Sequence, residues 1–197
     1  MRFAVVALAV GTPIGALSTQ TPRPTLELTP FVVGYQPIMP YTEGPLVDVR
    51  QTTGFGGGGH LSWRFARSYL LQGSLFLVRT DVARMGEEQQ PSTVQFADLR
   101  VVRASVYNGW HASLGIGGVS RSGAAWEEDP EGRRLRRSVS LGIGTRFRRE
   151  SRFPIELGGE MHWYNIESEG DSTLQHDLVF RLGLPIALYR GRTPGPS

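Results

Sequence analysis

The chain has 197 residues, of which 40% are hydrophobic and 20% are charged, and its formal net charge is +3. This length predicts one domain, and the absence of cysteine excludes disulfides, a thiol nucleophile and a zinc–thiolate site. The basic residues are all arginine and are clustered at a few places, which is a poor nucleic-acid footprint unless the fold gathers them on one face, so we expect no nucleic-acid partner. After the first twenty residues no apolar run is long enough for a spanning helix, but spanning strands are only half hydrophobic and stay compatible with this composition.

The first residues have the pattern of a secretory signal peptide. Arg2 precedes the apolar stretch 3–10, and the small residues Ala16 and Ser18 stand where signal peptidase needs them. We therefore divide the chain into a signal peptide, 1–18, and an exported domain, 19–197, with a short C-terminal tail. A buried first strand or helix is the alternative interpretation.

After residue 24, apolar residues recur at every second position, which is the period of a half-buried strand. The eight predicted strands cover 25–35, 55–65, 69–79, 93–103, 110–118, 135–147, 153–165 and 177–188. Their connections alternate between short turns and four longer segments that carry most of the acidic residues, namely 36–53, 80–92, 120–134 and 166–172. This alternation is typical of a membrane barrel with its longer loops outside the cell. The pattern predicts an all-β fold, an eight-stranded antiparallel up-and-down transmembrane β-barrel.

The polar face of these strands is rich in glycine and serine, which suits the narrow interior of an eight-stranded barrel. The apolar face carries aromatic residues near the strand ends, as membrane barrels do at the two interfaces. We expect an outward direction for Trp63, Leu114, Leu141, Leu157 and Leu182, and an inward one for His60, Ser113, Ser140, Glu160 and Arg181. The reverse would indicate a soluble, lipocalin-like carrier.

Several charged residues fall on the inward face, and buried charges need partners. We expect an ion-pair network that plugs the lumen, formed by Arg64, Asp98, Arg100, Arg136, Arg146, Glu156, Glu160, Asp177 and Arg181. A tight turn at 148–152 would place Arg146 opposite Pro154 and Ser140 opposite Glu160. Arg146 would then pair diagonally with Glu156, while Glu160 would find Arg100, Arg181 or His111 across the lumen. We expect Arg121 to be exposed in an outer loop.

Two segments resemble a broad family of bacterial outer-membrane β-barrel domain proteins, related in build to the OmpA transmembrane domain, OmpX and OmpW. Residues 174–184, LQHDLVFRLGL, look like the family's last strand, and residues 137–147, RSVSLGIGTRF, are similar to its glycine-rich sixth strand. The resemblance implies the fold and a place in the cell outer membrane, but no activity. The chain differs from this family in one respect. Such barrels end on an aromatic residue, whereas here Tyr189 is followed by an eight-residue tail.

Two constellations could carry chemistry. His111-Ala112-Ser113 is similar to the His-x-Ser of the lipid A deacylase PagL, with Glu156 or Glu160 as an acidic partner, but Leu114-Gly115 follows where that family has Asn-Ala. The inward-facing His60, His111 and His162 could bind a transition metal if they converged. Hydrogen bonding and packing inside a narrow barrel explain both sets, so we expect no enzyme, no cofactor and no metal.

The leading functional hypothesis is therefore a structural or surface-interaction barrel with a plugged lumen. A narrow OmpW-like, porin-like channel for small solutes is the alternative, and a PagL-like lipid A modifying enzyme is the second. The expected partners are outer-membrane lipid, lipopolysaccharide and the barrel-assembly machinery, and we expect a monomer.

Overall fold

A computed structural model describes residues 25–38, 41–43, 47–84, 88–105, 108–127, 133–147, 153–168 and 171–190. The predicted signal peptide, 1–18, and most of the C-terminal tail lie outside these residues. The described part of the chain contains no helix with the length and apolar character that a membrane crossing requires.

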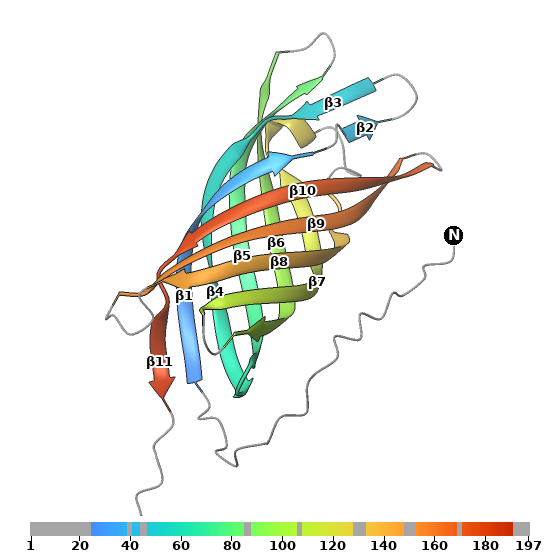
Figure 1. Cartoon of the computed structure of the whole chain (residues 1–197). Helices are drawn as coiled ribbons and strands as arrows, with labels where there is room; N and C mark the ends of the chain where they lie inside the picture. Colours follow the sequence, from blue (N-terminus) through green and yellow to red (C-terminus); the bar gives the residue numbers. More distant parts are fainter. Residues whose placement is uncertain are drawn as a thin grey trace, which may run out of the picture.

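One antiparallel sheet contains all the strands (Figure 1). The strands are β1 (Thr25–Pro37), β2 (Tyr41–Glu43), β3 (Val47–Gln51), β4 (Gly54–Ala66), β5 (Tyr69–Arg84), β6 (Gln90–Ala104), β7 (Trp110–Ser122), β8 (Arg136–Phe147), β9 (Ile155–Ser168), β10 (Asp171–Gly183) and β11 (Ile186–Arg190). Each strand from β4 to β9 pairs with the next, and β1 pairs with both β4 and β10, so the sheet closes on itself. The predicted eight-stranded barrel is confirmed.

Three short strands and one short helix add to the predicted eight. Strands β2 and β3 form a small hairpin on β5 within the connection 36–53, and the 3-10 helix η1 (Ala124–Trp126) lies in the connection 120–134. Strand β11 continues β10 beyond Pro185 and pairs with the first residues of β1. Because proline has no backbone N–H to donate, it interrupts the ladder and splits the eighth barrel strand in two.

The register of β8 against β9 differs from the expectation by two residues. Arg146 lies directly opposite Glu156, and Gly142, not Ser140, lies opposite Glu160. Pro154 cannot donate to the ladder, so the pairing begins at Ile155 and the hairpin connection is longer than expected.

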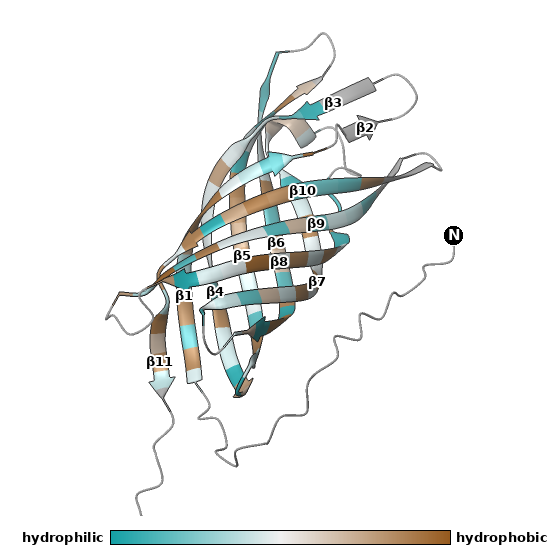
Figure 2. Ribbon diagram, viewed as in Figure 1, coloured by the Kyte–Doolittle hydropathy of each residue, from teal (hydrophilic) through white to brown (hydrophobic). Residues whose placement is uncertain are grey.

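Exposed apolar side chains cover the outside of the barrel. Hydrophobic and hydrophilic residues alternate along most strands (Figure 2). Trp63 is 48% exposed, whereas His60 is 2% exposed. The other residues with a predicted direction agree, with Leu114, Leu141, Leu157 and Leu182 exposed and Ser113, Ser140, Glu160 and Arg181 buried. Such an exterior on a closed sheet is that of a transmembrane barrel.

Antiparallel pairing of neighbours places the four longer connections at one end of the barrel, which we call the outer rim. Strands β2 and β3, helix η1 and the tip of the β9–β10 hairpin gather there (Figure 1). Aromatic side chains gather on the outer surface at the opposite, short-turn end, where Trp63, Phe65, Tyr69, Trp110 and Phe147 are exposed.

Candidate functional site: the lumen of the barrel

A glutamate at the centre of the lumen is held by two arginines from different strands. Arg100 of β6 and Arg181 of β10 both contact Oε1 of Glu160 in β9. Arg100 also donates to Asp98, from Nε to Oδ1 over 2.5 Å. Because β7 and β8 separate β6 from β9 in the sheet, the Arg100–Glu160 pair crosses the lumen and joins opposite walls.

A second group of ion pairs lies closer to the short-turn end. Arg146 of β8 donates to Glu156 of β9 over 2.9 Å and to Glu27 of β1 over 3.0 Å. His60 of β4 lies 3.5 Å from Glu156, and its Nδ1 lies 3.4 Å from Nη1 of Arg181. The two groups therefore form one continuous set of charged contacts, which we call the charged layer: Glu27, His60, Asp98, Arg100, Arg146, Glu156, Glu160 and Arg181.

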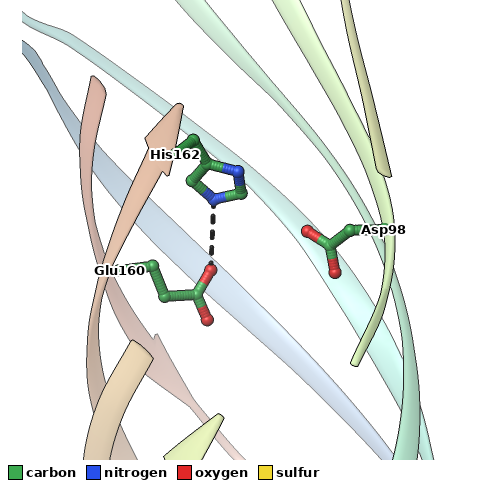
Figure 3. A group of neighbouring side chains, drawn as sticks. All are labelled: Asp98, Glu160 and His162. Carbon is green, nitrogen blue, oxygen red and sulfur yellow. Dashed lines mark ion pairs between the residues drawn. The ribbon is translucent and has the colours of Figure 1, made fainter. Parts of the chain in front are cut away.

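Part of the charged layer has the spacing of a metal site. Donor atoms of Asp98, Glu160 and His162 lie within 4.8 Å of one another, and all three residues are buried. Figure 3 shows the three side chains facing a common space, with His162 Nε2 3.4 Å from Glu160 Oε2. However, guanidinium groups of Arg100 and Arg181 already contact the two carboxylates. A cation there would have to displace those arginines, so the arrangement fits ion pairing better than metal binding.

The lumen becomes apolar between the charged layer and the outer rim. Phe76 of β5 and Phe96 of β6 stack with ring centroids 4.6 Å apart, and Phe96 also lies 4.8 Å from the ring of His162. Phe31 of β1 packs edge-on against Phe76 at 5.9 Å and lies beneath the guanidinium of Arg181 at 5.1 Å. We call this region the apolar layer, and it contains Phe31, Phe76, Val78, Val94, Phe96, Val119 and Val179, all buried.

Helix η1 covers the apolar layer at the outer rim. It turns Trp126 into the barrel, where the side chain is 1% exposed and its Nε1 donates to Ser92 Oγ over 2.7 Å. Arg121 lies between two rings, 5.5 Å from the ring centroid of Trp126 and 5.2 Å from that of Tyr164. Tyr164 accepts a hydrogen bond from Arg121 and donates one to Asp177. We call Arg121, Trp126, Tyr164 and Asp177 the mouth cluster.

Comparison with known proteins identifies no family. No protein-family model matches the chain, and no curated protein matches it. Among solved structures it is similar to the crystal structure of the outer membrane protein OprG from Pseudomonas aeruginosa, with 10% identity over 86% of this chain and 97% of that one and a TM-score of 0.49. It is also similar to the solid-state NMR structure of the outer membrane protein AlkL in lipid bilayers, with 10% identity over 95% of this chain and 100% of that one and a TM-score of 0.49. A likeness at this level carries no argument about function, which therefore rests on the geometry of the barrel itself.

The structure distributes the predicted lumenal charges over four places. Asp98, Arg100, Arg146, Glu156, Glu160 and Arg181 meet in the charged layer. Asp177 belongs instead to the mouth cluster. Arg64 lies at the short-turn end, where it donates to the carbonyl of Arg67, and Arg136 lies opposite Val119 toward the outer rim. His111 was one of three candidate partners of Glu160, and the contacts go to the other two, Arg100 and Arg181.

The expectation for Arg121 is wrong. Its side chain is buried and held by Trp126 and Tyr164 instead of lying exposed in a loop, because β7 extends to Ser122. Sequence reasoning also missed the apolar layer. Strands β5 and β6 have apolar residues on both faces in this region, so their alternation is weak. Such a run could have indicated that the inward face is apolar here.

His111 and Ser113 both face the lumen, and neighbouring glycines make room for them. A Cβ added at Gly144 would lie 2.5 Å from His111 Nε2, and one added at Gly142 would lie 2.6 Å from Ser113 Oγ. The adjoining hollow, which Gln72, His111, Arg146 and Glu156 help to line, measures about 50 Å³. That space suits a few water molecules and is far too small for a lipid substrate.

Proposed function

We propose that the protein is an outer-membrane barrel that conducts no solutes and has a structural or surface-interaction role at the outer rim. The observation that carries the proposal is the Arg100–Glu160 pair, which crosses the lumen with both side chains at most 1% exposed. A barrel of this size is only wide enough to be filled by its own side chains. Ions would have to break these pairs to pass, which is unfavourable because a buried charge without its partner is costly.

The apolar layer and Trp126 support the same proposal. A hydrated ion that passed the charged layer would next meet stacked phenylalanine rings and then the indole of Trp126, which is fixed to Ser92. The extensions beyond the barrel, namely β2, β3 and the tips of the β5–β6 and β9–β10 pairs, provide the surface for interactions.

Conductance in planar bilayers tests the closed lumen. We expect no conductance steps from the wild-type protein. We expect none from Trp126→Ala either, because the charged layer still crosses the lumen in that variant. Steady conductance of the wild type would overturn the proposal in favour of the narrow channel, and conductance of Trp126→Ala alone would indicate a channel gated by η1.

The orientation and the absence of catalysis are tested separately. The natural chain has no cysteine, so Glu88→Cys in a longer connection and Arg67→Cys in a short turn each provide a single label site. In intact cells, a membrane-impermeant maleimide should label the first and not the second.

Expression of the protein should leave the mass of lipid A unchanged, and a loss of acyl chains would support the lipid-modifying enzyme.

A further inference from the structure

The lipid-facing wall has an open hollow that extends over β4, β5, β6, β7 and β8 and reaches Leu28 of β1. Most outward-facing positions there carry leucine or isoleucine, but Gly59, Gly73 and Ala97 leave the surface recessed. The resulting hollow measures about 1210 Å³ and is bordered by Leu61, Leu99, Ile116 and Val139, among others. These bordering side chains are all exposed to the outside of the barrel.

Packing within the barrel does not explain the small residues in this hollow. A Cβ added at Gly73 would meet nothing within 4 Å, and one added at Gly59 would meet only ordinary contacts at 3.5 and 3.9 Å. The inward-facing glycines of the same strands differ, because a Cβ at Gly58 or Gly117 would lie 2.3 or 2.2 Å from a backbone oxygen. Glycine weakens a strand and often marks a place where a ligand approaches the backbone closely. The outward glycines therefore indicate a surface that is kept open for a ligand.

A single arginine lies at the outer end of the hollow. Arg137 of β8 is exposed and lines the hollow beside Val139, and it lies opposite Gly118 of β7. The polar Gln95 and Ser120, paired with each other one step farther toward the outer rim, mark the edge of the apolar belt. Across the described part of the barrel no hydrogen bond or ion pair engages Arg137. Among the described residues it is thus an unpaired cation above an apolar recess.

We propose that this hollow binds lipid A of lipopolysaccharide, with acyl chains against Gly59, Gly73 and Ala97 and a phosphate on Arg137. An amphipathic anion fits both halves of the site, since guanidinium groups bind phosphate through charge-assisted hydrogen bonds. The inference rests on the proposed outer-membrane location, because the outer rim then lies on the leaflet that contains lipopolysaccharide.

Native mass spectrometry of the full chain in detergent, titrated with purified lipid A, tests this site. We expect saturable binding to the wild type. Arg137→Ala should weaken binding about tenfold, the scale of one lost charge-assisted contact, and Gly73→Leu should weaken it similarly by filling the recess. Ala97→Leu fills the same recess from β6 and replaces Gly73→Leu if that variant fails to fold.

Two matched controls address charge and bulk. Arg79→Ala removes an exposed arginine near the outer rim that borders a different hollow, and Ala112→Leu adds bulk to the outer wall near the short turns. Both should bind lipid A like the wild type. With dephosphorylated lipid A, the wild type and Arg137→Ala should bind alike.

Three outcomes would overturn the inference. Equal losses of lipid A affinity from Arg79→Ala and Arg137→Ala would mean that lipid A responds to the total positive charge near the outer rim and not to a specific site. Unchanged binding in both recess-filling variants would show that acyl chains lie elsewhere. Equally tight binding of phosphatidylglycerol would make the site a general one for anionic lipids. Failure of the proposed function appears instead in the conductance and cysteine-labelling experiments, which do not depend on lipid binding.

Discussion

The two halves of the lumen are filled by different kinds of contact. Toward the short turns, the charged layer joins β1, β4, β6, β8, β9 and β10 through specific donor–acceptor pairs. Toward the outer rim, phenylalanine and valine side chains of the apolar layer fill the lumen. Both halves fill the lumen with side chains, but only the first depends on particular partners being present.

This difference predicts how each half responds to substitution. Removing one member of a buried ion pair leaves a charge with no partner, whereas a smaller apolar side chain costs only the lost contacts and any cavity. Equivalent changes in the two halves should therefore differ severalfold in their effect on stability.

The largest effect is expected at Glu160. Glu160→Gln keeps the size of the side chain but removes the negative charge that faces Arg100 and Arg181. We expect a loss of about 3–5 kcal/mol in the free energy of unfolding, measured by urea denaturation in detergent. Glu88→Gln, at an exposed position, should stay within about 0.5 kcal/mol of the wild type. A small effect at both positions would mean that water fills the lumen.

A smaller effect is expected at Arg146, whose side chain is 20% exposed. Arg146→Ala removes its contacts with Glu27 and Glu156 and should cost about 2 kcal/mol, the range for hydrogen bonds to charged groups. Arg79→Ala is the matched control, because Arg121 is buried and unsuitable for this purpose. Since the Arg146 site is partly open to solvent, its contribution should fall in high salt more than that of Glu160. Equal salt dependence would contradict the distinction between the two groups of ion pairs.

The smallest effect is expected in the apolar layer. Phe96→Leu keeps an apolar side chain against Phe76 and His162 and should cost about 1 kcal/mol, as conservative swaps in a core do. The same denaturation experiment measures it, with Leu114→Val on the lipid-facing surface as the control. A loss as large as that of Glu160→Gln would show that stacking of Phe76 and Phe96, not ion pairing, holds the lumen together.

The sequence predicted the closed barrel and the direction of its side chains because strong alternation fixes both. Strands such as β4 and β7 combine large outward residues with small inward ones, and their faces could be assigned without a structure. The exact register between strands is set by turns, and here Pro154 moved the β8–β9 pairing by two residues. The Arg146–Glu156 contact was compatible with both registers, because a long arginine reaches either the opposite or the diagonal neighbour.

The mouth cluster had no comparable periodic signal. Trp126 lies in a connection beside an acidic run, Glu127-Glu128-Asp129, which is typical of a solvated loop. Its burial depends on η1 turning back over the lumen, and that turn is decided by tertiary contacts with Ser92 and Arg121. Single-sequence patterns do not contain such contacts.

The Glu27–Arg146 contact joins residues 119 positions apart and connects the first strand with the second half of the chain. Hairpins between neighbouring strands close short loops, whereas β1 meets β10 and β11 only after nearly the whole chain is ordered, so we expect this seam to close late in folding. Interactions that form after the rate-limiting step affect the unfolding rate and leave the folding rate almost unchanged. We therefore expect the ion pair beside the seam to lower the unfolding rate of the closed barrel and to leave its folding rate almost unchanged.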